Sequence, residues 1–213
     1  MSTPQTRQAL MDAAVSLTAR EGVRAVTARA VAGEAGVNQA LVFYHFNGVD
    51  GLLREAFGQA TEQMVETYAA QLSEATTFTE LHAVALRLGA HSQAVGQAAL
   101  LAHVLSAAQS DPVQAELLAR SLDMWRQAVE QAVSRLLNDR GLAGAVDVDG
   151  LTRSLSAATI GMITIDAVPG QPLGNTLESL AGLAALADRL TSVVPAPITR
   201  RALRSARNSR PAD

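Results

Sequence analysis

The stretch that decides the fold is TARAVAGEAGVNQALVFYHF, residues 27–46. Apolar residues recur at helical spacing on both sides of Gly36, with Val31 before it and Val42 after it. Glycine can adopt the bend between two helices without a side-chain clash. The pattern therefore predicts two short helices joined by a tight turn, a helix-turn-helix.

Both helices of this motif begin at residues suited to capping. The Thr27 hydroxyl can accept a hydrogen bond from a free backbone N–H at the start of the first helix, and we expect Asn38 to cap the second. The outward positions of the second helix carry small, amide or aromatic side chains rather than charged ones: Asn38, Gln39, Ala40 and Tyr44. Such a face can read the edges of DNA bases.

A further helix is expected on each side of the motif. Ser2-Thr3-Pro4 is a helix-start signal, and a helix from there to Glu21 would pack across the helix-turn-helix and fix its angle. On the other side Asn47-Gly48 predicts a turn, after which Asp50 is expected to cap a long helix.

The rest of the chain also has helical patterns. Further helices are expected at about 78–94, 97–109, 112–140, 149–168 and 174–194, each with an apolar stripe of Leu, Ala and Val. No segment alternates in the manner of a strand, and aromatic residues make up only 3% of the chain. The sequence therefore predicts an all-α fold.

The order of residues in the central stretch resembles the DNA-binding domain of the tetracycline-repressor (TetR) family of bacterial transcriptional regulators. The resemblance rests on Thr27, Val31-Ala32, Ala35-Gly36-Val37 and above all Val42-Phe43-Tyr44-His45-Phe46. It implies a three-helix helix-turn-helix DNA-binding domain over residues 1–47 and a helical effector-binding and dimerisation domain over 48–196. Residues 197–213 would form an Arg-rich tail, either disordered or a non-specific grip on DNA.

The resemblance assigns contacts to the first helix of the motif. Thr27 matches a phosphate-contacting position, a role compatible with capping. Arg29 matches a position that reaches a base or the backbone, the alternative being a solvated surface charge. Guanidinium to guanine is the commonest specific contact in the major groove.

The resemblance also assigns contacts to the second helix. Asn38, Gln39 and Ala40 fall where recognition begins; Gln39 could pair with adenine and Ala40 could touch a thymine methyl group. Tyr44 and His45 match aromatic and phosphate-facing positions.

Two positions depart from the family pattern. Phe43 stands where the family commonly has Tyr, so a hydroxyl contact is lost and we expect Phe43 mainly to pack. Val49 stands where the family commonly has Lys, which removes a phosphate contact.

The two last helices are apolar nearly all round, so each must bury more than one face. Either they are central in a monomer, or they pair with a second copy. The resemblance favours the second reading, because TetR-like proteins dimerise by pairing their last two long helices into a four-helix bundle. The residues expected at that interface are Leu155, Ala158, Met162, Leu177, Leu180, Ala184 and Ala187.

The central helices carry scattered aromatic, sulfur-containing and histidine side chains that are either plain core or the wall of an effector pocket, which the resemblance implies. They are Met64, Tyr68, His82, Leu86, His103, Met124 and Trp125. The histidines lack the spacing of a helical metal pair, so no metal or cofactor is expected. No catalytic motif is visible. We therefore expect no enzyme, the rival being an all-α enzyme that carries a helix-turn-helix.

Charge is unevenly distributed along the chain. Residues 1–50 hold four Arg and four acidic residues. Residues 51–199 hold eight Arg and fifteen acidic residues, and residues 200–213 hold five Arg and one acidic residue, which gives a net charge of −3 for the chain. The DNA-facing end therefore need not be repulsive. The chain has no Cys, no apolar run that could span a membrane and no signal peptide, so we expect a cytoplasmic protein.

These observations together predict a homodimeric DNA-binding regulator. Its partners would be a double-stranded, palindromic DNA operator and a small apolar effector that releases a repressor from it. The alternative is an activator, or a regulator that needs no effector.

Overall fold

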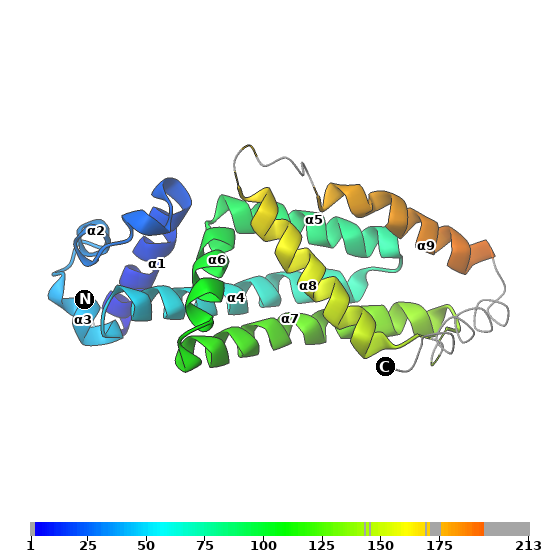
Figure 1. The fold of residues 1–213 in the computed structure, drawn as a ribbon, viewed down its shortest axis with the longest axis horizontal. Helices are drawn as coiled ribbons and strands as arrows, with labels where there is room; N and C mark the ends of the chain where they lie inside the picture. Colours follow the sequence, from blue (N-terminus) through cyan, green and yellow to red (C-terminus); the bar gives the residue numbers. More distant parts are fainter. Residues whose placement is uncertain (1–2, 143, 145, 169, 171–175, 194–213) are drawn as a thin grey trace.

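The computed structural model describes residues 3–142, 144, 146–168, 170 and 176–193 (Figure 1). Those residues form helices and turns and contain no strand, as the sequence predicts. The helices are α1 (Thr3–Glu21), α2 (Ala28–Glu34), α3 (Ala40–Phe46), α4 (Val49–Glu74), α5 (Phe78–Ala94), α6 (Gln97–Ala108), α7 (Pro112–Asp139), α8 (Val148–Asp166) and α9 (Ala181–Val193), with short 3₁₀ turns η1 (Val23–Ala25) and η2 (Glu178–Leu180).

The helix boundaries follow local capping chemistry. Asp111 accepts from the backbone N–H of Val113 at 2.9 Å and starts α7, while Asp147 accepts from Gly150 at 3.1 Å and starts α8. The last helix differs from its predicted range of 174–194: α9 begins at Ala181, after η2. Residues 197–213, the predicted tail, lie outside the described residues.

The helix-turn-helix is formed by α2 and α3, and α1 packs across both of them as expected. Leu10 and Ala14 of α1 share a buried cluster with Val31 of α2 and Val42 of α3. Each of these four side chains is fully buried. The three helices therefore enclose a closed core that fixes the angle between α2 and α3.

The turn from α3 into α4 is set by backbone geometry. Asn47 adopts the left-handed conformation with φ 58°, and Gly48 is the residue before α4. Asp50 therefore lies in the first turn of α4 and is not its cap, which corrects the sequence prediction. Gly51 lies so close to the end of α3 that an added Cβ would meet the Phe46 carbonyl oxygen at 1.8 Å.

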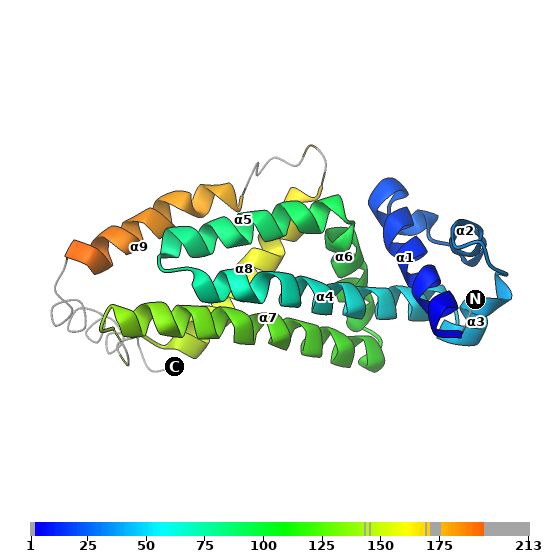
Figure 2. The ribbon, with the colours of Figure 1, turned by 180° about the vertical axis from the view of Figure 1, so that it is seen from behind.

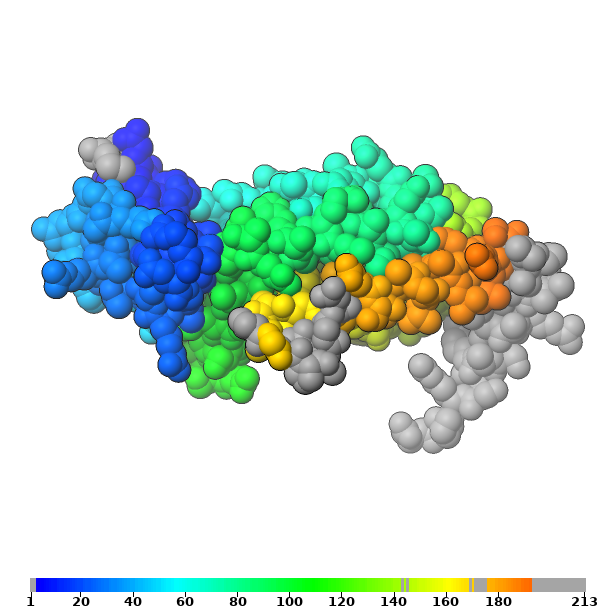
Figure 3. Space-filling model, turned by 90° about the horizontal axis from the view of Figure 1, so that it is seen from above, coloured from blue at the N-terminus to red at the C-terminus, as the bar shows by residue number. Residues whose placement is uncertain are grey.

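The body is built on the long helices α4 and α7. Figure 2 shows α4 between α5 and α7, with α8 crossing behind them. Helix α6 runs crosswise at the end of the body nearest the helix-turn-helix and contacts α1, α4 and α7. Helix α9 lies along the surface beside α5 (Figure 3).

One hydrophobic core joins the two parts. The cluster that contains Leu10 and Val42 continues through Leu53 and Phe57 of α4 into Leu101 of α6. Helices α1, α2 and α3 and the near end of the body are therefore packed as one continuous unit.

The two C-terminal helices are the most exposed of the body, so they are not central within one subunit. Helix α8 buries only Thr152 and Ile163, and α9 buries no side chain over residues 181–192. Large aliphatic side chains face outward on both helices and just after α8: Leu155, Ile165, Val168, Leu183, Leu186 and Leu190. Within the described part of the chain, no helix combines the length and apolarity needed to cross a bilayer.

Candidate functional site

Helix α3 presents an exposed, uncharged face at the end of the molecule. Gln39 and Ala40 are exposed at its start, and the exposed fractions of Phe43 and Tyr44 are 57% and 77%. Phe43 was expected mainly to pack, and this is wrong: it stands out beside Tyr44. Two protruding aromatic rings on a seven-residue helix give it a largely apolar outer surface.

Thr27 caps α2 as the sequence predicts, whereas the residue directly before α3 is Gln39, and Asn38 bonds the first N–H of α3 from one position further back. Thr27 Oγ1 accepts from the N–H of Ala30 at 3.2 Å, and Asn38 Oδ1 accepts from the N–H of Ala40 at 2.9 Å. The Asn38 oxygen is thus engaged by its own backbone, which leaves its NH₂ group as the part that can reach outward. Thr27 is exposed and sits at a helix N-terminus, where backbone N–H groups favour an anion.

Arg29 and His45 occupy different surroundings. Arg29 is exposed on α2. His45 is half-buried, and its ring lies edge-on to Tyr44 with 4.8 Å between centroids. Its backbone oxygen accepts a hydrogen bond from Arg7 at 3.2 Å.

Arg7 is a bracing residue that sequence reasoning missed. Its guanidinium also pairs with Glu55 of α4 and lies 4.9 Å from the centre of the Phe46 ring. Helix α1 thereby ties the C-terminal end of α3 to α4. Its partners are 38 or more positions away in the chain, so no local pattern could have indicated this role.

A second brace joins α1 to α2. Arg20 forms two hydrogen bonds of 2.7 Å to the carboxylate of Glu34, which also accepts from Ser16 Oγ at 2.8 Å. These hydrogen bonds lower the pKa of Glu34 to about 2, and the carboxylate in turn raises the pKa of Arg20. The brace holds the end of α2 against α1.

The body contains a cavity of about 460 Å³. Side chains from α4, α5, α6, α7, α8, η2 and α9 line it, and most of them are aliphatic or aromatic. Its size and its apolar wall are typical of small-molecule sites.

Three of the predicted effector-pocket residues line this cavity: Met64, His82 and Trp125. Tyr68 does not line the cavity. Its hydroxyl lies between α4 and α5, 3.1 Å from His91 Nδ1. Leu86 packs against the cluster around Ile163.

The other two residues are on helix faces turned away from the cavity. His103 is two positions beyond Leu101, which lines the cavity, and so projects on roughly the opposite side of α6. Met124 precedes the lining residue Trp125 by one position, about 100° around the helix.

Two polar residues of the wall were not predicted. Gln97 Oε1 and Ser156 Oγ are buried and have no hydrogen-bond partner within the described structure. Only tertiary contacts reveal them, since Gln and Ser in an apolar helix carry no spacing signal. Such orphaned groups are rare in native cores.

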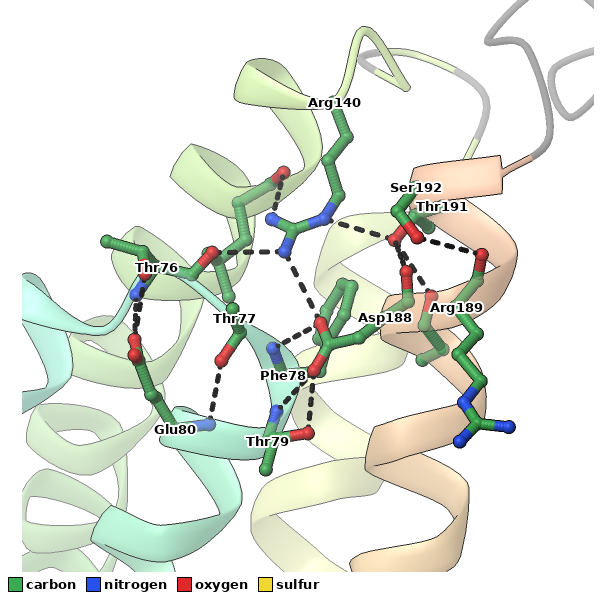
Figure 4. A network of polar contacts seen from close by, with 12 residues as sticks. Thr76, Thr77, Phe78, Thr79, Glu80, Arg140, Asp188, Arg189, Thr191 and Ser192 are labelled. Atoms are coloured by element: carbon green, nitrogen blue, oxygen red, sulfur yellow. Dashed lines mark hydrogen bonds and ion pairs between the residues drawn. The ribbon is translucent and has the colours of Figure 1, made fainter.

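A polar clamp holds α9 over the cavity's far end (Figure 4). Asp188 accepts from the N–H groups of Phe78 and Thr79 at 2.8 and 2.9 Å, at the N-terminus of α5. Arg140 pairs with the same carboxylate at 3.3 Å and donates to Thr191 Oγ1 at 3.1 Å. Burial opposes ionisation of Asp188, but these hydrogen bonds and Arg140 hold its pKa below its usual value.

The expected interface residues fall into two groups. Leu155 and Ala158 are exposed on α8, although Leu155 also lines the cavity, and Met162 is half-buried. Leu177 is buried inside the subunit, where it packs near Gly89, while Leu180, Ala184 and Ala187 are half-buried and also line the cavity. No group of histidine and acidic side chains suited to a metal ion occurs in the described ranges.

Comparison with known proteins places this architecture. Residues 10–56 match the family of bacterial regulatory proteins, tetR family. No curated protein matches the chain. A candidate transcriptional regulator from Streptomyces coelicolor is 28% identical, with a TM-score of 0.60 over 85% of this chain and 99% of that one.

Two more distant structures share the fold. A TetR transcription regulator from Haloarcula marismortui is 20% identical, with a TM-score of 0.68 over 88% of this chain and 98% of that one. The transcriptional regulator FadR from Bacillus subtilis, in complex with stearoyl-CoA, is 18% identical, with a TM-score of 0.62 over 82% and 96%. The matched N-terminal residues and the shared helical architecture together identify this chain as a transcriptional regulator of the TetR family.

Proposed function

We propose that the protein is a homodimeric repressor that leaves a palindromic operator when a small apolar effector enters the cavity. The observation that carries this proposal is that the cavity and the core of the helix-turn-helix share side chains. Phe57 and Leu101 line the cavity and also belong to the core that holds α1, α2 and α3. A ligand that displaces these side chains must act on the DNA-binding helices, because packed cores deform in discrete steps rather than smoothly.

The proposed DNA surface combines the exposed face of α3 with the N-terminus of α2. We assign base contacts to the start of α3, together with Arg29, and phosphate contacts to Thr27 and His45. The full set is Thr27, Arg29, Asn38, Gln39, Ala40, Tyr44 and His45, to which the exposure of Phe43 adds an eighth residue.

Dimerisation is proposed through α8 and α9. Five large aliphatic side chains exposed on these helices, together with Val168 just after α8, would otherwise face water, and contiguous apolar patches commonly mark protein interfaces. We retain Leu155, Ala158 and Met162 in this interface and replace the buried Leu177 by Leu186 and Leu190. A two-fold dimer would place two α3 helices on half-sites about one helical turn, or a multiple of it, apart.

The proposed signal path runs through the turn between α5 and α6. Gly96 has φ +73°, and an added Cβ would lie 2.7 Å from the backbone nitrogen of Ala19 in α1. The next residue, Gln97, lines the cavity. A ligand that moves this turn shifts α1 and with it α3, so it changes the population of dimers whose two α3 helices match the operator.

The boundaries of the functional units follow from these assignments. We assign residues 1–47 to DNA binding and 48–196 to effector binding and dimerisation, since α4 begins just after Asn47. We propose the cytoplasm as the site of action, because operator DNA is there. The same fold accommodates a ligand in the Bacillus subtilis FadR complex with stearoyl-CoA.

The test begins with selection of bound sequences from a random DNA pool. We expect an inverted repeat whose half-sites lie about 10 base pairs, or a multiple, apart. A metabolite collection is then screened for compounds that raise the melting temperature and lower operator affinity. Ligands that stabilise the protein but tighten operator binding would indicate an activator, and selection of no sequence would contradict specific DNA binding.

A further inference from the structure

We propose that the effector is an uncharged, mainly apolar molecule that donates a hydrogen bond, and that Gln97 is the residue that selects for this donor. This inference rests on the proposed effector site and defines its ligand class.

The cavity wall carries no charge that could receive an ionic ligand. No Asp, Glu, Lys or Arg occurs among the described residues that line it. Its one histidine, His82, has its Nε2 engaged 2.7 Å from the carbonyl oxygen of Leu177, which can only accept. An ionic group placed here would lose its hydration without gaining a counter-ion, which is strongly unfavourable.

The orientation of the Gln97 amide follows from which neighbouring groups donate and which accept hydrogen bonds. Thr61 Oγ1 donates its only proton to the carbonyl oxygen of Phe57 at 2.9 Å, so towards Gln97 it can only accept. Gln97 Nε2 therefore faces Thr61, at 2.9 Å. The amide oxygen must then be on the other side, and it has no partner.

This orphaned oxygen sets the ligand's polarity. Gln97 is only 5% exposed, and its Oε1 is buried away from bulk solvent. A carbonyl oxygen only accepts, so a hydroxyl or N–H group on a bound molecule would satisfy it, whereas an ether or carboxylate oxygen would be repelled. Ser156, the other orphan of the wall, both donates and accepts and so does not discriminate.

The experiment uses three probes with ten carbon atoms each: n-decanol, its isomer methyl nonyl ether, and decanoate at mildly alkaline pH. Binding to the full-length protein is measured by thermal shift and by calorimetry. We expect decanol to bind about five-fold more tightly than the ether, from one added hydrogen bond in a buried site. Decanoate should bind most weakly.

Two variants test the assignment to Gln97. Gln97→Leu should bind decanol and the ether equally well. Gln114→Leu is the matched control, because Gln114 also has a buried, unpartnered Oε1 but does not line the cavity. It should keep the preference of the wild type, which also shows that loss of a buried amide does not by itself alter selectivity.

The outcomes separate this inference from the proposed function. Equal binding of alcohol and ether by wild type, preferred binding of decanoate, or binding of no probe would overturn the ligand class. A preference that survives in Gln97→Leu would overturn the role of Gln97. If the probes bind with the Gln97-dependent preference but operator affinity does not change, the ligand class stands and effector release falls.

Discussion

The helix-turn-helix end of the molecule and its helical body differ both in their cores and on their surfaces. The end formed by α1, α2 and α3 has a closed core, and its exposed helix α3 shows amide and aromatic side chains. The body has a cavity inside and exposed leucines outside. All three buried side-chain oxygen atoms without a partner in the described residues belong to the body. A closely packed helix-turn-helix is therefore attached to a body that has room for a small molecule.

The largest expected effect comes from the outer surface of the body. In Leu186→Glu/Leu190→Glu, two charges replace side chains that are 51% and 50% exposed in one subunit but buried in the proposed dimer. Light scattering should show a monomer, with helical content retained. Operator affinity should fall by about 10³-fold or more, to the level of non-specific binding. A dimer that persists would place the interface on another surface.

The junction between α3 and α4 is tested by Gly51→Ala. The added methyl group would meet the Phe46 carbonyl oxygen at 1.8 Å, so α3 must shift relative to α4. We expect the free energy of unfolding to fall by about 3 kcal/mol in urea denaturation. Gly58→Ala, on the same helix, is the control: its Cβ meets only Leu117, at 3.5 Å. It should be neutral or stabilise by up to about 1 kcal/mol. Equal effects of the two changes would deny the tight α3–α4 junction.

The outer surface of the helix-turn-helix is tested by Gln39→Ala and Arg29→Ala. Both side chains are exposed, so neither change should alter the fold. Each should weaken operator binding by about 1–3 kcal/mol per lost base contact. Non-specific binding, measured on unrelated DNA, should change much less for Gln39→Ala. Wild-type operator affinity in both variants would remove α2 and α3 from base recognition.

The smallest expected effect concerns the polar brace between α1 and α2. The pKa of Glu34 is lowered from 4.5 to about 2 in the folded protein, so its pairing with Arg20 stabilises the fold above about pH 4.5. That contribution is lost as the pH falls from 4.5 towards 2. Glu34→Gln should therefore narrow the stability difference between about pH 6 and about pH 3 in low salt.

The control for this brace is Glu62→Gln, an exposed glutamate of α4 outside the described ion pairs. It should leave the pH dependence as in the wild type. A pH dependence that is unchanged in Glu34→Gln would mean that the Arg20 pair forms no net stabilising contact in solution.

The sequence by itself determined where the helices lie and that two of them form a helix-turn-helix. Capping residues and apolar periodicity act within a few positions, so Thr27 and Asn38 could be assigned hydrogen bonds to backbone N–H groups at the starts of α2 and α3, which the structure confirms. The helix-turn-helix was predictable for the same reason, since its turn and its inward stripe lie within 20 consecutive residues.

Only the tertiary structure decided which side chains meet. Arg7 braces α3 through partners in α3 and α4, and Gln97 is an orphan only because Thr61, 36 positions away, fixes its orientation. The Leu177 side chain is turned inward while Leu186 and Leu190 are exposed, although all three fall in the one helix predicted for residues 174–194. Periodicity predicts that a helix has an apolar face, but it does not predict what covers that face. The covering depends on contacts between elements distant in the chain.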